Sequence, residues 1–276
     1  MSNTQKRIAS ALVLGIAVAI CVVYGIKSTL AFILVFSVLA IDEIFCNFFK
    51  KKRFSLNYFI SQGIFLAPFI YFFYLDAAPG LVSMFINAAL LMNVLMIVYL
   101  FYISMESDFI NKFGAKFPYL AGIIILLPMM SLGSMTYFAQ WRSLLAILLI
   151  VNFGMDTGAW FFGKNFGKHK LWPKVSPNKT IEGLVGGIVT SGVVGGIFWQ
   201  VFFGTMSVQH FLFFAFLGLM SQVGDLIQSK IKRQVGIKDS SALIPGHGGV
   251  YDRIDSLIFL APFFVTALKY FYIVKA

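Results

Sequence analysis

The residues whose types and spacing could do chemistry are three aspartates near the end of the chain, Asp225, Asp252 and Asp255. Asp252 and Asp255 are three residues apart, and Asp225 is four residues before Ser229, so each pair shares one face of a helix. Carboxylate oxygens in a partly wet site suit Mg²⁺, whose shell is usually completed by waters and substrate phosphates. If the two helices are neighbours, the three carboxylates predict a metal site. The alternative is that they only pair with Lys232, Arg233 or Arg253.

Two basic loops accompany these acids, GKNFGKHKLWPKVSPNKTIEG at 163–183 and SKIKRQVGIKDSSALIPGHGG at 229–249. Both lead into a helix, and backbone N–H groups at a helix start bind anions. In the first loop Ser176 or Thr180 can cap the helix or donate to a phosphate, and Lys179 adds a positive charge. In the second, the glycines allow close approach to a ligand, and His247 can donate to a phosphate oxygen. Taken alone, either loop could be no more than solvated positive charge; beside buried acids, the two predict a site for a metal-complexed polyphosphate.

The elements that position these residues are membrane helices. The chain has 276 residues, of which 59% are hydrophobic and 12% are charged, and a soluble domain cannot bury that much apolar surface. Each of nine segments has roughly the 20 residues that a crossing needs: 8–26, 29–49, 56–74, 79–103, 117–138, 142–163, 181–204, 209–229 and 249–273. We therefore expect an all-α, polytopic integral membrane protein with one domain over 1–276, in which 1–140 supplies N-terminal helices and 141–276 the catalytic helices and loops.

Positive charge sets the orientation of these crossings. With the N-terminus inside and the C-terminus outside, 17 of the 22 lysines and arginines lie in inside segments and 3 in outside segments. This orientation puts the basic run 50–53 at the cytoplasmic face. That run either binds anionic headgroups or a nucleotide, or only fixes the topology.

The acids are one-sided in this orientation. Seven of them lie in the cytoplasmic half of the membrane, Asp225, Asp252 and Asp255 at depths of about 5–9 Å; the other four are Asp42, Glu43, Asp156 and Glu182. A charge in the membrane is costly and tends to be functional or paired. The pattern indicates a recessed pocket open to the cytosol. A transporter is the rival interpretation, but transport sites lie near the midplane and often accompany internal repeats, and no repeat is visible here.

The run from Ser229 to Asp255 resembles the signature of the phosphatidate cytidylyltransferase (CDP-diacylglycerol synthase) family. It matches at S-x-I-K-R, K-D, P-x-H-G-G and D-R-x-D with the family's spacing. Residues 156–183 resemble the family's other characteristic region, and GDLIQS at 224–229 fits the helix between them. Over the first 140 residues the resemblance rests on hydropathy and on Glu43. Asn178 and Ile181 depart from the family's Gly and Trp, and neither supplies chemistry.

The resemblance implies the reaction of CTP with phosphatidate to give CDP-diacylglycerol and pyrophosphate. It implies Mg²⁺ dependence, leaves open a second monovalent or divalent cation, and implies a homodimer in the cell (inner) membrane with its site facing the cytoplasm. The partners are then CTP, phosphatidate and membrane lipid, with no nucleic acid. Asp225, Asp252 and Asp255 match the family's acids, which bind metal and take part in catalysis. Lys232 and Arg233 match basic positions and complete the catalytic set. The substrate-binding set is Ser176, Lys179, Thr180, Glu182, Ser229, Lys238, His247 and Arg253. A kinase acting on another lipid and a non-enzymatic scaffold are the remaining alternatives.

Overall fold

The structure, a computed structural model, describes residues 3–272, and the side chains of residue 5, residues 7–268 and residue 270. Its α-helices are α1 (Asn3–Tyr24), α2 (Ile26–Glu43), α3 (Leu56–Phe73), α4 (Val82–Tyr102), α5 (Phe109–Lys116), α6 (Ala121–Ser134), α7 (Trp141–Phe166), α8 (Ile181–Phe203), α9 (Val208–Gln234) and α10 (Tyr251–Tyr272). A π-helical turn, η1 (Ile44–Phe48), continues α2. Two strands, β1 (Lys170–Trp172) and β2 (Ser176–Thr180), form an antiparallel hairpin between α7 and α8.

Eight of the described helical segments are long and apolar enough to cross a membrane, which confirms the prediction of an all-α, polytopic membrane protein. They follow the first eight predicted crossings, from Arg7–Tyr24 to Val208–Gln234. The ninth predicted crossing, 249–273, forms helix α10, although its residue 273 lies outside the described residues. Because α10 is not one of the eight, the ninth crossing stays a prediction, as does the orientation of the termini.

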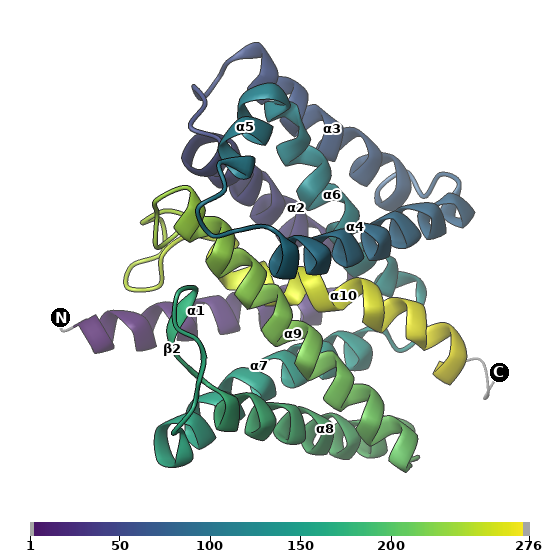
Figure 1. Cartoon of the computed structure of the whole chain (residues 1–276). Coiled ribbons are helices and arrows are strands. Elements are labelled where there is room, and N and C mark those ends of the chain that lie inside the picture. The colour runs from purple at the N-terminus through teal and green to yellow at the C-terminus, as the bar shows by residue number, and fades with distance from the viewer. Residues whose placement is uncertain (1–2, 273–276) are drawn as a thin grey trace. The chain divides into compact units, whose positions relative to one another are not determined.

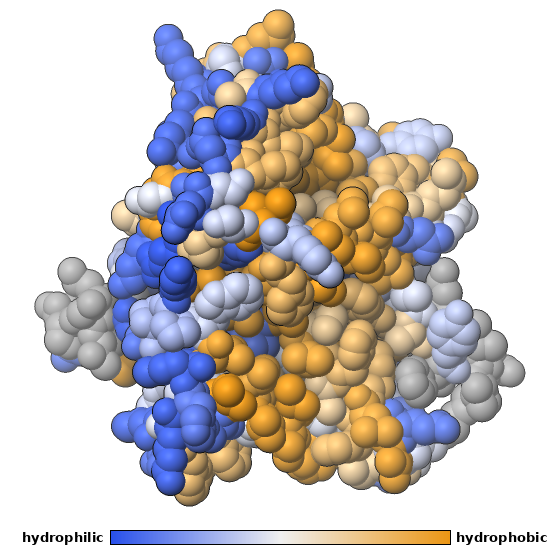
Figure 2. All heavy atoms as spheres, viewed as in Figure 1, coloured by the Kyte–Doolittle hydropathy of each residue, from blue (hydrophilic) through white to orange (hydrophobic). Residues whose placement is uncertain are grey.

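Hydrophobic side chains cover much of the visible surface in Figure 2, as lipid-facing helices require. On α1, for example, Leu12, Val13 and Ile16 are all more than half exposed. No water is present in the bilayer core to make such exposure costly, so these residues need no covering partner.

The chain divides into two compact units, and three helices, α4, α9 and α10, run from one unit into the other. The first unit takes in the described residues of Met1–Ala89, Glu106–Thr136 and Ile231–Ile254. In it α2, α3 and α6 pack against one another (Figure 1). Phe45, Phe65, Phe69 and Ile125 are fully buried and form its core. Whether the two units make up one domain, as predicted for 1–276, stays a prediction.

The second unit takes in Leu90–Met105, Tyr137–Lys230 and the described part of Asp255–Ala276. Its main contact is between α7 and α8, which lie side by side in Figure 1. Small residues make this close approach possible, since a Cβ added at Gly187 would lie 2.7 Å from the sulfur of Met155. Glycine faces of this kind are typical of helix pairs in membranes, where close van der Waals contact replaces the hydrophobic effect.

The β1–β2 hairpin is a difference from the predicted loop 163–183. Trp172 at the end of β1 stacks on Phe101 of α4, with ring centroids 6.2 Å apart. Lys230 of α9 is 1% exposed, and its ammonium group lies 5.8 Å from the Trp172 ring. The same ammonium group donates to the carbonyls of Tyr99 and Leu100, at 3.1 and 2.8 Å, in the last turn of α4. A buried lysine thus satisfies the open carbonyls of one helix and anchors the hairpin that carries Lys179.

Candidate active site

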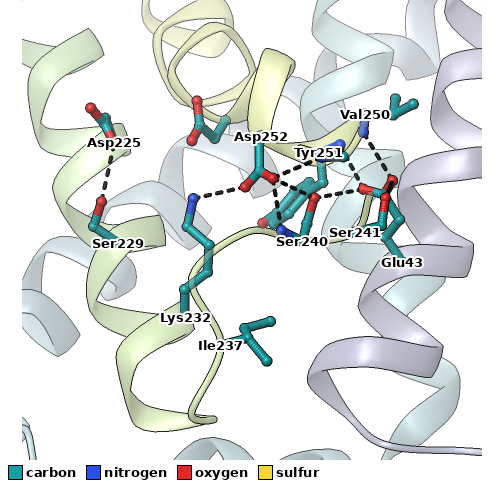
Figure 3. Close-up of polar contacts among 12 residues, drawn as sticks. Glu43, Asp225, Ser229, Lys232, Ile237, Ser240, Ser241, Val250, Tyr251 and Asp252 are labelled. Atoms are coloured by element: carbon teal, nitrogen blue, oxygen red, sulfur yellow. Dashed lines mark hydrogen bonds and ion pairs between the residues drawn. The ribbon is translucent and has the colours of Figure 1, made fainter. Parts of the chain in front are cut away.

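Asp252 lies in the first turn of α10, where the helix dipole favours a negative charge, and is 8% exposed. Its oxygen Oδ1 accepts a hydrogen bond of 2.8 Å from Lys232 Nζ. Its oxygen Oδ2 accepts from the backbone N–H of Ser240 at 2.7 Å, the Ser240 hydroxyl at 2.9 Å and the backbone N–H of Gly249 at 2.9 Å (Figure 3). One oxygen is thus held by neutral donors and the other by a cation. We call Asp252, Lys232, Ser240 and Gly249 the Asp252 cluster.

Glu43, at the end of α2, supports this cluster and is 3% exposed. Its two oxygens accept from the hydroxyls of Ser240 and Ser241, at 2.8 and 2.6 Å, and from the backbone N–H groups of Val250 and Tyr251, at 2.9 and 2.8 Å (Figure 3). Asn47, one turn later on η1, donates to the carbonyl of Ser240 at 2.6 Å. The end of α2 therefore holds both the loop before α10 and the first N–H groups of α10.

The glycines of the loop 244–249 approach acids of the chain itself. A Cβ added at Gly249 would meet the Ser240 hydroxyl and lie 2.5 and 2.6 Å from the two oxygens of Glu43, so no side chain fits there. Gly248 has a φ of +83°, a conformation that side chains disfavour. The close backbone approach predicted for a ligand is made, in this structure, toward Glu43 and Asp252.

A second cluster lies within the second unit. Lys179, on β2, forms an ion pair of 2.5 Å with Oδ2 of Asp225 on α9, and the Ser229 hydroxyl donates to Oδ1 of the same carboxylate at 3.2 Å. The side chains of Lys179 and Asp225 are 21% and 29% exposed, so solvent reaches the pair. Asp225 and Ser229 do share one face of α9, as their spacing predicted. The hairpin brings Lys179 to that face.

The other predicted residues divide between structural contacts and exposed positions. Thr180 caps α8 by accepting from the backbone N–H of Gly183 at 3.1 Å, which is one of its two predicted roles; its role toward a phosphate stays a prediction. Glu182 accepts from Nδ1 of His169 at 2.6 Å, and Asp255 accepts from the backbone N–H of Ser256 at 2.8 Å. Ser176 lies in β2 and is half-buried, whereas Arg233, Lys238 and Arg253 are exposed.

His247 contacts α1. Its Nδ1 lies 2.6 Å from the hydroxyl of Ser10, and Arg7 Nε donates to the carbonyl of Gly246 at 2.9 Å. Burial lowers the pKa of His247 below its ordinary value, and the positive charges of Arg253 and Arg7 lower it further. The lowered pKa favours the neutral imidazole, and the ring makes a contact that its sequence motif did not indicate.

The chemistry of the acid groups fits Mg²⁺, although their convergence is untested. Asp252 belongs to the first unit, and Asp225 and Asp255 belong to the second, so a site built from all three stays a prediction. In the part of the chain that the structure describes, no group of three or more His, Cys, Asp and Glu side chains is arranged to hold a metal ion. What favours a cation is the donor set: Asp252 and Asp225 each present a hard oxygen to a lysine ammonium group, where a positive charge is already accommodated.

Sequence reasoning assigned no role to Glu43, Asn47 or Ser240. Glu43 was visible only as an acid near the inside end of a crossing. Its partners are 197 to 208 residues away along the chain, and no spacing rule connects them. The resemblance of Glu43 to a family position was the one signal in the sequence that could have singled it out.

The chain matches one protein family and is similar to three curated relatives. Residues 5–271 match the Cytidylyltransferase family. A stretch of 123 residues is 45% identical to the phosphatidate cytidylyltransferase of Bacillus subtilis (strain 168) and covers 44% of this chain and 46% of that protein. Stretches of 110 residues are 46% identical to the proteins of the same name from Staphylococcus haemolyticus (strain JCSC1435) and Staphylococcus aureus (strain COL), and cover 39% of this chain and 42% of each relative. The chain thus matches under half the length of these curated relatives.

Proposed function

Because the chain belongs to the cytidylyltransferase family, we propose that it transfers the cytidylyl group of CTP to phosphatidate and releases CDP-diacylglycerol and pyrophosphate. The observation that carries this proposal is the Asp252 cluster. A carboxylate that is 8% exposed, paired with Lys232 and fixed by Ser240 and Gly249, is built from the same run of residues that resembles the family signature. The name shared by the relatives supports the choice of lipid acceptor.

The proposed reaction is a nucleotidyl transfer. A phosphate oxygen of phosphatidate attacks the α-phosphorus of CTP, a new P–O–P bond forms, and the bond between the α-phosphorus and the oxygen of the β-phosphate breaks. Pyrophosphate leaves with the electron pair of that bond. The nucleophile is already anionic, so no strong general base is needed, and catalysis depends on positioning and charge neutralisation.

The chain's own cations supply part of that neutralisation. Lys232 and Lys179 each contact an aspartate in this structure and have flexible stems, so they can turn toward a phosphate oxygen when substrate binds. Arg233, Lys238 and Arg253 are exposed and can contact the triphosphate or the lipid phosphate. In this proposal His247, Ser176, Thr180, Glu182 and Ser229 position the groups that touch substrate.

Mg²⁺ dependence is part of the proposal, with Asp225, Asp252 and Asp255 as the residues that would hold the ion. When bound, Mg²⁺ neutralises the triphosphate and stabilises the charge that develops on the leaving group. Ser240 and Gly249 would keep the Asp252 carboxylate in one orientation, since they donate to Oδ2 and leave Oδ1, the oxygen that now accepts from Lys232, to the ion. We also propose that the site faces the cytoplasm of a cell (inner) membrane, where CTP from water meets a lipid headgroup, and that the protein is a homodimer.

The test uses purified protein in detergent with phosphatidate micelles, Mg²⁺ and CTP labelled in the α-phosphate. We expect label to enter the organic phase only when phosphatidate is present, and EDTA to stop the transfer. Absence of transfer by folded protein, across several divalent metals and with added K⁺, would refute the proposal. In a parallel reaction with CTP labelled in the γ-phosphate, transfer of label to the lipid would instead identify a lipid kinase.

A further inference from the structure

A cavity of about 410 Å³ opens in the first unit beside the end of α2 and the start of α3. Its volume lies in the range of small-molecule pockets, about 300–1,000 Å³. Val38, Leu39 and Leu243 give it an apolar wall, and Glu43 is also part of its lining. Because Glu43 and Asp252 accept from the same Ser240 hydroxyl, the cavity adjoins the Asp252 cluster.

The polar end of the cavity carries a guanidinium group with donors to spare. Arg53 Nε and Nη2 donate to the two oxygens of Asp42, at 2.7 and 2.5 Å, and the Tyr58 hydroxyl donates to Asp42 at 3.0 Å. The acid is therefore neutralised by contacts within the chain. The Arg53 side chain is 54% exposed, and these two bonds use two of the five N–H groups of a guanidinium. Phosphates are the anions that a planar arginine fork binds best.

The loop that presents Arg53 has a strained backbone. Lys50 has a φ of +52° and Phe54 a φ of +60°, both in the left-handed region that residues with side chains disfavour. Strain of this kind is concentrated at functional sites, where the surrounding structure holds it. Here it brackets the basic run 50–53 and brings Phe54 to the lining of the cavity, with its ring centroid 5.6 Å from that of Tyr58.

We propose that this cavity binds the lipid acceptor, with the phosphate group at Arg53 and the glycerol and upper acyl chain along Val38, Leu39 and Leu243. The inference rests on the proposed function for the identity of the lipid, a phosphate monoester with two acyl chains. The chemistry of the lining carries the rest: it combines an apolar wall with one cation, Arg53, at the mouth. In the predicted topology this end of α2 lies at the level of the headgroups, where such a lipid presents its phosphate.

Two pairs of variants test the cavity. Arg53→Gln removes the cation. Its control is Lys52→Gln, because Lys52 is an exposed lysine one residue away that does not line the cavity. Leu39→Trp fills the apolar wall, and Val35→Trp, one turn earlier on α2 and 52% exposed, controls for the added indole. The Trp pair keeps the test valid if Arg53→Gln fails to fold, which thermal denaturation reports.

The first readout does not depend on turnover. A phosphatidate analogue with a photoreactive acyl chain is bound to the detergent-solubilised protein without CTP, cross-linked and mapped by mass spectrometry. We expect labelling between residues 38 and 58 that is lost in Arg53→Gln and Leu39→Trp but kept in both controls. The second readout is kinetic: the KM for phosphatidate should rise about tenfold to a hundredfold in Arg53→Gln, the equivalent of one charge-assisted contact, while the KM for CTP stays constant.

The outcomes separate this inference from the proposed function. Labelling of the cavity in a protein without transferase activity would support the lipid site and refute the transferase. Transferase activity with labelling elsewhere, or with equal effects of Arg53→Gln and Lys52→Gln, would overturn the cavity alone. Equal competition by phosphatidylglycerol would also overturn it, because the site would then be one for anionic lipids in general.

Discussion

Glu43→Gln is the sharpest perturbation that the structure offers, because it changes one atom of a buried carboxylate that accepts four hydrogen bonds. Each oxygen of Glu43 accepts from one serine hydroxyl and one backbone N–H. Glutamine keeps one oxygen with its two donors. Its amide N–H₂ group then faces a hydroxyl, which can rotate to accept, and a backbone N–H, which cannot.

The expected cost follows from this count. A hydrogen bond to a charged group contributes about 1.5–3 kcal/mol, and a buried donor left unsatisfied costs about 1–3 kcal/mol. Loss of the negative charge at the start of α10 adds about 0.3–1 kcal/mol. We therefore expect Glu43→Gln to lower the free energy of unfolding by roughly 3 kcal/mol, which lowers Tm by about 6–12 °C at about 2–4 °C per kcal/mol.

The assay is thermal denaturation in detergent, with transferase activity measured below the transition. Asp76→Asn is the matched control, since Asp76 is exposed, its side chain makes no hydrogen bond or ion pair among the described residues, and its φ of +49° is one that asparagine tolerates. We expect the control to stay within about 0.5 kcal/mol of the wild type. If Glu43→Gln unfolds within 2 °C of the wild type (~0.5–1 kcal/mol) and keeps full activity, the argument that Glu43 holds the Asp252 cluster is wrong.

Four further results are expected. Asp252→Asn should lower Tm, because Lys232 loses its buried carboxylate partner, and should lower kcat, measured below the transition, by at least about a hundredfold if the carboxylate binds metal; ordinary turnover by the folded variant would remove Asp252 from the metal site. Lys179→Ala should mainly raise the KM for CTP, and an unchanged CTP dependence would leave Lys179 a purely structural role beside Asp225. Lys232→Met should lower the free energy of unfolding by about 3–5 kcal/mol in the absence of metal, because it leaves the buried Asp252 carboxylate without its cation. Excess Mg²⁺ should then raise the Tm of this variant more than that of the wild type; equal shifts would argue against metal at Asp252. Burial and two arginines lower the pKa of His247, so the folded state disfavours the protonated imidazole, and stability should fall as the pH drops below about 6.5. In His247→Asn, Tm should fall less steeply over that pH range. An unchanged slope would show that the lowered pKa of His247 does not contribute to the pH dependence of stability.

The membrane helices could be predicted from sequence because lipid leaves the backbone few choices. Every N–H and C=O in the bilayer core must be satisfied inside the segment, so length and hydropathy alone find the helix. The predicted segment 142–163, for example, lies within α7, Trp141–Phe166. The helix extends beyond residue 163, the predicted end, because Lys164 and Asn165 end the run of apolar residues but not the backbone hydrogen bonds of the helix.

The hairpin and the Glu43 contacts could not be predicted, for two different reasons. Strands of three and five residues are too short to show the alternation of apolar and polar residues that predicts a strand. Tertiary contacts, such as the stacking of Trp172 on Phe101, hold them in place. The Glu43 contacts are non-local: the sequence shows a glutamate, two serines and the start of an apolar helix at Val250 and Tyr251, but not that they meet. Beyond the family resemblance of Glu43, the requirement that a buried acid find donors indicates that partners exist, but not which residues they are.

At the sequence level, an ion pair and a metal site were alternative explanations for each aspartate, but the two are compatible. Lys232 donates to Oδ1 of Asp252, while neutral donors hold Oδ2. Asp225 repeats the arrangement in its own unit, with Ser229 on one oxygen and Lys179 on the other. A carboxylate in this environment needs a positive charge at all times, whether or not substrate is present. A lysine on a flexible stem can provide that charge and withdraw when another cation arrives, because the neutral donors keep the carboxylate in place. The same pair can therefore stabilise the resting fold and leave one oxygen exchangeable, as the proposed metal-nucleotide site would require.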